Sequence, residues 1–539
     1  MTDKFVKILA TLLMSLALMS CGETDRSLPE LMFVAQPSVS PIATQAHAWE
    51  LTVSTNLFTA VQASLDDGMG HAYTITFGRQ QRDHVLTLLG MYPNRTYTVN
   101  VLVATLDGIT LDAPTPLQIT TPPLPANFPV INLLAGDPAL MEPGYTLMDT
   151  GRKDGSASFI VILDDAAEVV WYFQTDSLSE TERLASGRFL SLDEGSGLIR
   201  FIDERGVVDD CLYSAQSHPA TGTCVPVDVS EFHDDVVKHN LLANYFTSIR
   251  DSSRTVDNFP LDETDPLITG TVNVVDEPII QIDLSGNIID RWDFLDMLKP
   301  TRIGFDGTSG LPAAADWVHV NSVFYDVLDD NLIVSLKHQD AVVNFDRITS
   351  TINWILGTPA NWQGFEQFLL TPDGGTFAWP YHQHAVELTN GNIVMFDNGN
   401  RRASPFTGEP IVAADANSSR AVEYAIDPAT MMISQVWEWG LAQSGESLYS
   451  PFAGDADRLF GGNTLMTFGG LCEVGGIPSE DLANCRSSAR VIEVDTTTNA
   501  AVFDVSIDDA DPMSSGYIVN RSERIGALYA EVTISITVP

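Results

Sequence analysis

The chain has 539 residues, 44% of them hydrophobic, which suits an ordered protein with more than one domain and excludes a disordered one. Its formal net charge is −43, with only 28 Lys and Arg residues. This charge excludes nucleic acid as a partner and predicts an acidic, solvated surface that an anionic ligand must approach.

The N-terminus has the pattern of a lipoprotein signal peptide. Lys4 and Lys7 precede an apolar run at 8–19 that is too short to span a bilayer. The run ends in Leu-Met-Ser-Cys, which resembles the cleavage box of bacterial lipoproteins and implies a lipid on Cys21. An ordinary signal peptide with a fortuitous Cys is the alternative. We expect residues 1–20 to be removed, which leaves a periplasmic or cell-surface lipoprotein. It would contact a membrane only through its lipid, and we expect that membrane to be the outer membrane.

Residues 21–122 are predicted to form an N-terminal tether and a small β-sandwich. The stretches "AWELTVSTN", "AYTITFG" and "YPNRTYTVNVLV" alternate apolar and polar residues as short strands do. The last of them resembles the tyrosine-bearing strand of fibronectin III and immunoglobulin-like sandwiches. The Pro-rich segment 120–129 is typical of a semi-rigid linker. A seventh copy of the repeat described next is the alternative.

One pattern recurs six times in the rest of the chain: an alternating apolar strand ending in Asp, a short turn, and a second strand that usually carries an aromatic residue. Its copies are 159–171, 198–212, 279–292, 341–354, 421–437 and 490–503. Period-two strands around a polar turn predict hairpins, and repeated antiparallel sheets without helical periodicity are typical of a β-propeller. We therefore predict an all-β protein whose residues 123–539 form a six-bladed β-propeller behind the sandwich.

The cysteines indicate an oxidising compartment. Cys211 and Cys224 are thirteen residues apart, and so are Cys472 and Cys485. Two local loops of equal size favour two disulfides, although other pairings are open from sequence alone. Neither CxxC nor zinc-finger spacing occurs, so no structural zinc is predicted.

A propeller binds its ligands where loops of several blades converge, and the histidines are distributed accordingly. His233, His319 and the pair His382 and His384 each stand just before a predicted strand in three consecutive repeats, and Lys337 ends another strand. A single histidine is more often a packed or surface residue than a catalyst. Three such groups in consecutive repeats predict one shared site.

Two stretches here resemble a known family. They are "DWVHVNSVFYD…DDNLIVSLKHQDAVVNFDRITSTINWILG" (316–357) and "HQHAVELTNGNIVMFDNGN" (382–400). Both resemble the bacterial arylsulfate sulfotransferases. The resemblance implies a six-bladed propeller behind a β-sandwich, a phenolic sulfate ester as donor, a phenol as acceptor, and no nucleotide or other cofactor. No GxxxxGK[ST] phosphate loop occurs, which fits this expectation.

The resemblance also implies roles for individual residues. His384 would attack sulfur and become a sulfohistidine in a ping-pong reaction, while His319, His233 and a basic residue hold the sulfuryl oxygens. Asn321, in the same motif as His319, would bind substrate. The family's basic residue is an arginine, but this chain has Lys337, which keeps the charge and loses the planar fork.

Other functions are left open by the sequence. His382 has no counterpart in the family motif and is expected to flank the site. His382, His384 and His319 could instead bind a metal in a metal-dependent propeller enzyme. Two observations argue against this: "WPYHQH" contains no carboxylate, and the positive charge of Lys337 would lie close to the metal ion. We expect no metal. A non-enzymatic, lipid-anchored binding propeller is the other alternative. The oligomeric state, a homodimer included, and the physiological donor and acceptor have no signal in the sequence.

Overall fold

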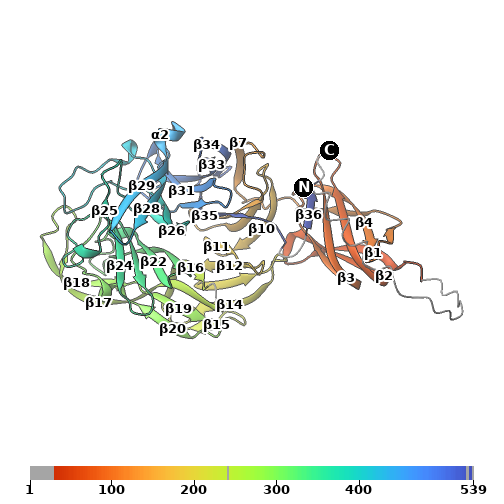
Figure 1. Cartoon of the computed structure of the whole chain (residues 1–539), viewed down its shortest axis with the longest axis horizontal. Coiled ribbons are helices and arrows are strands. Elements are labelled where there is room, and N and C mark those ends of the chain that lie inside the picture. The colour runs from red at the N-terminus through yellow and green to blue at the C-terminus, as the bar shows by residue number, and fades with distance from the viewer. Residues whose placement is uncertain (1–28, 240–241, 530–532, 537–539) are drawn as a thin grey trace, which may run out of the picture.

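The computed structural model describes residues 29–239, 242–529 and 533–536 (Figure 1). Cys21 and the predicted signal peptide therefore lie outside the described residues. Among the described helices, none is both long and apolar enough to cross a membrane. Helix is limited there to single turns, namely α1 (Phe294–Met297), α2 (Leu441–Ser444), η1 (Lys337–Gln339), η2 (Glu366–Phe368) and η3 (Ala414–Ala416).

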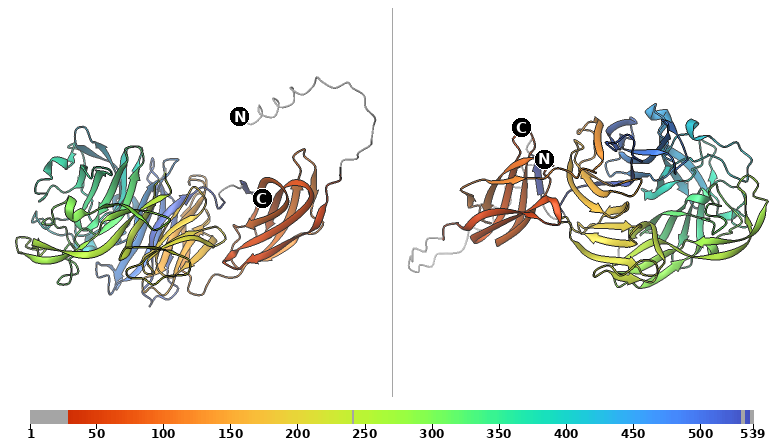
Figure 2. Two further views of the ribbon diagram at one scale, coloured as in Figure 1. Left: turned by 90° about the horizontal axis from the view of Figure 1, so that it is seen from below. Right: turned by 180° about the vertical axis from the view of Figure 1, so that it is seen from behind.

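Six sheets of four to six strands are arranged in a ring around a common axis, as Figure 1 and the right-hand view of Figure 2 show. Four of the sheets follow one another in the chain. The first consists of β11 (Ser179–Arg183), β12 (Phe189–Asp193), β13 (Leu198–Ile202), β14 (Val208–Ser214) and β15 (Val225–Val227), and the second of β16 (Glu231–Lys238), β17 (Asn244–Pro260), β18 (Thr269–Asp276), β19 (Ile279–Asp283) and β20 (Ile288–Trp292). The third consists of β21 (Val320–Asp326), β22 (Asn331–Leu336), β23 (Ala341–Asp346) and β24 (Ile352–Gly357), and the fourth of β26 (His384–Thr389), β27 (Asn392–Asp397), β28 (Arg420–Asp427), β29 (Met432–Trp439) and β25 (Thr371–Pro372).

The remaining two sheets join the ends of the ring. They are β30 (Asp455–Arg458), β31 (Thr464–Val474), β32 (Ile477–Pro478), β33 (Arg486–Asp495), β34 (Ala500–Asp508) and β7 (Val130–Gly136); and β35 (Tyr517–Ile525), β8 (Tyr145–Arg152), β9 (Ser158–Leu163) and β10 (Val169–Thr175). Strand β7 from the start of the propeller pairs with β34, and β35 from its end pairs with β8. The inner strands β11, β16, β21, β26, β30 and β35 contact one another in succession around the axis. The predicted all-β propeller is confirmed.

The repeated hairpin found in the sequence forms the third and fourth strands of each sheet, counted outward from the inner strand; β15, β25 and β7 lie outside it in three of the sheets. Its Asp residue accepts main-chain N–H groups two to four positions ahead, which is the Asx-turn geometry that favours Asp here. Asp164, for example, accepts from Ala166 and Glu168, both at 3.0 Å. Three of the aromatic residues link neighbouring sheets, because their indole N–H groups donate to oxygens in the next sheet's turn: Trp171 to Glu204, Trp292 to Arg347 and Trp437 to Asn499.

The N-terminal strands form a β-domain of their own. They are β1 (Phe33–Ile42), β2 (Gln45–Asp66), β3 (Ala72–Leu88), β4 (Thr96–Ala104), β5 (Thr110–Asp112) and β6 (Leu117–Thr120). The 22-residue β2 pairs with β1, β3 and β4, so the pairing joins all of them in one sheet, and the division into two packed layers stays a prediction.

The C-terminal strand corrects one predicted boundary. Strand β36 (Thr533–Ile536) pairs with β3 rather than with any propeller strand, so the end of the chain returns to the N-terminal domain. The range 123–539 is therefore too long for the propeller. This pairing could not be predicted from the sequence because β36 is short and its partner strand lies more than 400 residues away.

The two domains share one apolar cluster. Val53 and Val61 of β2 belong to the same buried cluster as Ile160, Trp171 and Phe189 of the propeller. Hydrogen bonds support this contact, among them Gln45 Nε2 to Tyr172 O at 2.7 Å and Leu89 N to Tyr529 Oη at 2.6 Å. The N-terminal domain is thus packed on the propeller.

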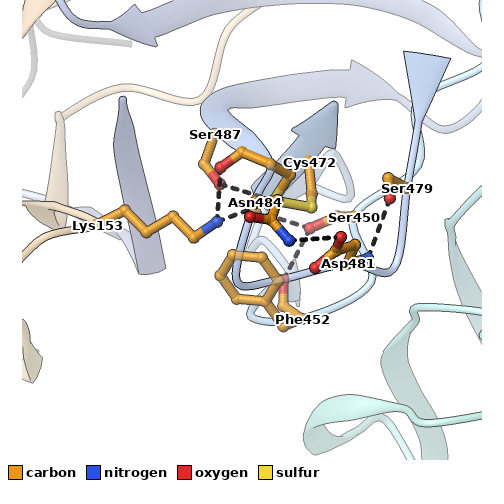
Figure 3. The surroundings of a disulfide bond; sticks show 10 residues. Lys153, Ser450, Phe452, Cys472, Ser479, Asp481, Asn484 and Ser487 are labelled. Carbon is orange, nitrogen blue, oxygen red and sulfur yellow. Dashed lines mark hydrogen bonds between the residues drawn. A yellow bond between two sulfur atoms is a disulfide. The ribbon is translucent and has the colours of Figure 1, made fainter. Parts of the chain in front are cut away.

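Both predicted disulfides are confirmed: Cys211 pairs with Cys224, and Cys472 with Cys485. Figure 3 shows the surroundings of Cys472, with Lys153 reaching in from the opposite side. The Lys153 ammonium donates to Cys485 O at 2.8 Å, and partial burial lowers the pKa of Lys153. This disulfide links the two ends of the segment that connects β31 to β33.

Removing the Cys472–Cys485 bond should lower stability. A disulfide between residues 13 positions apart stabilises the folded state by about 3 kcal/mol, because it restricts the unfolded chain. We expect the double variant Cys472→Ser and Cys485→Ser to lose about that much free energy of unfolding in urea. The fully reduced wild type serves as the control and should be the less stable of the two, because it lacks both bonds. A double variant as stable as the oxidised wild type would contradict the prediction.

Candidate functional site

The predicted site residues lie at the N-terminal ends of three neighbouring inner strands. His233 is in β16, His319 directly precedes β21, and His384 begins β26, while Lys337 begins the η1 turn that links β22 to β23. Each of the three inner strands has a register shift at this point. Such bulges bend a strand and re-aim its side chains.

Left-handed backbone accompanies these bulges. Asp234, His319 and His382 have φ values of 48°, 47° and 52°, and Ala385 follows with 51°. A non-glycine residue in this region is uncommon, and such residues gather at functional sites. The conformation turns successive side chains of each strand end toward the same place.

His384 is held in one tautomer. Its Nδ1 lies 2.6 Å from Asn398 Oδ1 and 3.1 Å from His382 O. The Asn398 amide is oriented by its own N–H groups, which donate to Ser450 O and Ala453 O at 2.8 Å each. Both neighbours of Nδ1 are therefore acceptors, so Nδ1 carries the proton and Nε2 keeps its lone pair.

Lys337 supplies positive charge beside His384. Its main-chain N–H donates to His319 O at 3.1 Å, which fixes η1 against the strand end before β21. Within the part of the chain that the structure describes, no carboxylate lies within 4.0 Å of the Lys337 ammonium. Burial, followed by the charge of Lys337, lowers the pKa of His384 well below its usual value, so its imidazole is neutral at neutral pH. The same two causes lower the pKa of His319.

His319 is fixed by a carboxylate. Its Nδ1 lies 2.8 Å from Asp316 Oδ2, an oxygen that also accepts from Arg250 Nη2 at 3.0 Å. Arg250 Nη2 also lies 3.2 Å from His319 Nδ1. The shorter contact is the one to Asp316, so we place the proton on Nδ1, donating to Asp316, and the lone pair on Nε2. The His338 ring stacks on His319 with centroids 4.5 Å apart and supports its plane.

His233 lies beside His319 in an acidic surrounding. The two rings meet edge to face with centroids 5.2 Å apart. His233 Nδ1 is 3.4 Å from Asp234 Oδ2 and 3.9 Å from Glu277 Oε1. Burial lowers the pKa of His233 to about 4 despite the nearby charge of Glu194. Burial and the neighbouring Asp316 raise the pKa of Glu277 to about 8.

His382 has a different role from His384. Its Nδ1 and its main-chain N–H both lie 2.9 Å from Asp340 Oδ1, and its Nε2 is 3.3 Å from Asp306 Oδ2. Burial alone would lower the pKa of His382, but the two carboxylates raise it to about 9. His382 is therefore an imidazolium clamped between carboxylates. The sequence missed these carboxylates because both come from other segments of the chain.

This clamp removes the basis for the alternative metal site. An imidazolium has no lone pair to give a metal ion. The groups of described residues whose ligand atoms converge closely enough for an ion include neither His382 nor His384. They are formed by His233, His319 and neighbouring residues instead.

The His382 clamp should make stability depend on pH. The folded protein binds a proton at His382 that the unfolded chain releases near pH 6.5. The stabilisation is fully present below 6.5 and is lost as pH rises through about 9. We expect His382→Gln to lose on the order of 3 kcal/mol at pH 6 and to lose this part of the pH dependence. Urea unfolding at pH 6 and above 9 measures both effects, with His218→Gln, a change outside the site, as control. An unchanged slope between the two pH values would contradict the assignment.

The Asn321 side chain is buried and bonds to the main chain beside His384. Its Nδ2 donates to Gln383 O at 2.6 Å, which fixes the peptide just before His384. Its own main-chain oxygen accepts from Arg521 at 3.3 Å, and the Asn321 side chain is buried. The Oδ1 atom makes no hydrogen bond with a described residue. The structure thus gives Asn321 a positioning contact, and its predicted contact with substrate stays a prediction.

A cavity of about 620 Å³ lies farther along the axis and is distinct from the histidine cluster. Its lining comes from the later parts of the inner strands, and the site histidines are not among it. Arg521 and Asp235 line its end and form a two-pronged ion pair at 3.1 and 3.2 Å. Arg521 also donates to Asn321 O at 3.3 Å, and its charge contributes to the lowered pKa of His384.

Four functional neighbours were missed by the sequence reasoning. Asn398 follows the strand of "GNIVMF", and Asp316 opens the "DWVH" stretch, so both stood inside segments already quoted. Arg250 and Glu277 come from β17 and the turn after β18, and only their 2.8 Å ion pair beside His319 reveals them. No local pattern marks either residue.

The fold and the site together define a β-propeller with neutral histidines and the ammonium of Lys337 at the N-terminal ends of its inner strands. Comparison with known proteins shows a family likeness: residues 256–518, just under half of the chain, match the family model described as arylsulfotransferase (ASST). The predicted resemblance to the arylsulfotransferases is thus confirmed for this segment. It contains His319, Lys337 and His384, whereas His233 lies upstream of it.

Two curated relatives are arylsulfate sulfotransferases by name. The arylsulfate sulfotransferase AssT of Escherichia coli O6:H1 is 28% identical over 247 residues, which are 37% of this chain and 40% of that protein. The AssT of Lelliottia amnigena is 28% identical over 256 residues, which are 38% of this chain and 42% of that protein. The match spans about 40% of the length of these curated relatives. Among solved structures, a hypothetical selenium-binding protein from Sulfolobus tokodaii matches with a TM-score of 0.30 and 9% identity over 71% of this chain and 91% of that one.

Proposed function

We propose that this protein transfers a sulfuryl group from an aryl sulfate ester to a phenol, with His384 as the nucleophile. One observation carries the proposal: Nδ1 of His384 contacts two acceptors, which leaves the lone pair on Nε2, and the charge of Lys337 acts on the same ring. A neutral imidazole in that tautomer is a nucleophile at neutral pH. The family of the segment around it supports the same reaction class.

In the first half-reaction, His384 Nε2 attacks sulfur and the bond from sulfur to the aryl oxygen breaks. The phenolate leaves with the electron pair of that bond, which is favourable because a phenol has a pKa of about 10. The His384 ring becomes a cation with sulfur on Nε2 and the proton on Nδ1. Asn398 Oδ1, 2.6 Å from Nδ1, stabilises this cation by accepting its N–H.

In the second half-reaction, the acceptor phenol attacks the same sulfur and the bond from Nε2 to sulfur breaks. The acceptor loses its proton to solvent, the electron pair of the broken bond returns to Nε2, and His384 returns to its neutral form. Donor and acceptor thus bind in turn at one site, which gives ping-pong kinetics.

Lys337 has the charge that this transfer needs. The sulfuryl oxygens carry negative charge in both half-reactions, so a fixed positive group near them stabilises the transition state. The ammonium acts as a single point of charge, whereas a guanidinium would offer a planar fork to two oxygens. Burial lowers the pKa of both His233 and His319, so neither is set up as an imidazolium that donates a proton to the leaving group.

We also propose that the mature protein is an extracytoplasmic lipoprotein attached through Cys21. The two disulfides are compatible with that compartment. Labelling of the expressed protein with a fatty acid, and its loss in Cys21→Ser, tests the attachment.

The proposed reaction is tested by incubating the purified protein with 4-nitrophenyl sulfate. Without acceptor we expect one burst of nitrophenol per chain and a protein heavier by one sulfuryl group, which peptide mapping should locate on His384. Added phenol should discharge that group and restore turnover. Release of nitrophenol without any sulfuryl-protein, or a sulfuryl group on another residue, would reject His384 as the nucleophile. A binding propeller without activity would give no release at all.

A further inference from the structure

One guanidinium joins four segments that connect strands of the propeller. Arg401, between β27 and β28, contacts Glu263 Oε2 at 3.3 Å, Asp306 Oδ1 at 3.0 Å and Glu480 Oε2 at 3.4 Å. Glu263 lies between β17 and β18, Asp306 between α1 and β21, and Glu480 between β32 and β33. We call Arg401 and its three carboxylates the Arg401 junction. The junction fixes segments from different sheets of the ring against one another.

The partners of Arg401 are themselves held in place. Glu263 Oε1 accepts from Thr308 N at 3.2 Å and from Thr308 Oγ1 at 2.8 Å, so Glu263 also contacts the segment that carries Asp306. The Arg401 guanidinium lies over the Phe305 ring, 4.9 Å from its centroid, in that same segment. Several charges in one fixed geometry hold one another in position better than an isolated surface pair does.

The Glu480 side of the junction is anchored by a disulfide (Figure 3). Glu480 lies between Cys472 and Cys485, and the main-chain oxygen of its neighbour Asp481 accepts from Cys485 N at 3.0 Å. Glu480 Oε1 also accepts from the hydroxyl of Tyr449. This carboxylate therefore belongs to a segment that is tied at both ends, and it keeps Arg401 in one position.

The junction reaches His384 through His382. The other oxygen of Asp306, Oδ2, lies 3.3 Å from His382 Nε2. His382 has left-handed backbone with φ of 52°, and its main-chain oxygen lies 3.1 Å from Nδ1 of His384. A non-glycine residue keeps this conformation only when its surroundings fix it. The Asp306 side chain is 38% exposed, so water would draw it away from His382 if Arg401 did not hold its outer oxygen.

We propose that Arg401 is a positioning residue for His384. It holds the Asp306 carboxylate against the His382 ring, and the His382 peptide in turn fixes Nδ1 of His384. The effect on His384 rests on the proposed function, whereas the hold of Arg401 on Asp306 does not. The alternative is that Arg401 is only a positive charge near His382.

The two views differ in the sign of one measurable change, that of the pKa of His382. Two further titratable groups face this ring: Asp340 Oδ1, 2.9 Å from Nδ1, and the His338 ring, with centroids 5.9 Å apart. As a mere charge, Arg401 opposes an imidazolium at His382, so its removal would raise that pKa. As the group that holds Asp306, its removal releases the carboxylate to water and lowers the pKa of His382 from about 9.

The test follows the His382 ring by NMR in intact protein labelled with ¹⁵N at histidine. The signals of His382 are those that are absent from His382→Gln. We expect the pKa of His382 to fall by about one pH unit or more in Arg401→Gln, in the same direction as in Asp306→Asn. The double variant should fall no further than Asp306→Asn alone, because both changes break one contact. A rise in Arg401→Gln, or no change, would overturn the proposal.

Two further variants guard against a general loss of structure. Arg401→Lys keeps the charge but has one nitrogen in place of the fork that reaches three carboxylates, so it should show part of the same fall. An unchanged pKa of His382 in Arg401→Lys would show that charge alone matters. Arg188→Gln is the matched control, because the Arg188 side chain has the same 27% exposure, pairs with Asp210 at 2.8 Å and lies over Phe201. It should leave the pKa of His382 unchanged.

The effect on His384 is measured in the first half-reaction. At saturating 4-nitrophenyl sulfate, the rate constant of the nitrophenol burst should fall roughly ten- to a hundredfold in Arg401→Gln, because a misplaced nucleophile slows the chemical step. KM for the donor should change much less. A burst as fast as that of the wild type, in a variant whose His382 has the lowered pKa, would overturn the link to His384. A wild type without any burst would count against the proposed function, and the pKa of His382 would still decide whether Arg401 holds Asp306.

Discussion

Replacing His384 with Asn should abolish phenol-dependent release of nitrophenol from 4-nitrophenyl sulfate. Asn can still donate toward the position of His384 Nδ1, but it has no basic nitrogen with a lone pair to attack sulfur. Loss of a catalytic nucleophile costs roughly 10⁴-fold or more in kcat. Initial rates at saturating donor and acceptor measure the effect, and intact-mass analysis should find no sulfuryl-protein in the variant.

The control for this variant should separate chemistry from folding. His218→Asn changes another histidine outside the site, where its Nδ1 contacts Ser214 Oγ at 2.8 Å. It should keep the wild-type rate. If His384→Asn retained more than a few per cent of the rate while still unfolding at the wild-type temperature, His384 would not be the nucleophile.

Replacing Lys337 with Met should cost roughly 10²- to 10³-fold in kcat/KM, because it removes a positive charge aimed at the transferring group. Met has a similar length and packs in the same space, so η1 should keep its contact through Lys337 N and His319 O. The pKa of His384 should also rise toward its usual value, since the ammonium helps to lower it. The pH profile of kcat/KM should therefore fall off at a higher pH on its acidic side than in the wild type.

Lys337→Arg is the matched variant. It keeps the charge and restores the fork that the family resemblance predicts at this position. We expect it to stay within about tenfold of the wild type. If Met and Arg were equally active, the charge at position 337 would have no part in transfer; if both were equally inactive, the length and packing of lysine would matter more than its charge.

The sequence by itself determined the repeated unit, because the interactions that form it are local. Each hairpin pairs residues within one short segment, and its Asp accepts N–H groups only two to four positions ahead, as Asp164 does. The disulfides were predictable for the same reason, since each closes a separation of 13 residues. The same strand pattern placed the histidines just before the inner strands, and the family resemblance identified His384 among them as the candidate nucleophile.

Only the tertiary structure decided which charges surround those histidines. Asp340 and Asp306 make His382 a clamped imidazolium, and Glu277 reaches His233 from a different strand. Such contacts join residues about 40 to 80 positions apart through the convergence of neighbouring blades, and no periodicity in the sequence records them. The same holds for β36, which closes the N-terminal sheet from the far end of the chain. Local patterning thus specifies the blades, while the packing of one blade against the next decides the electrostatics of the site.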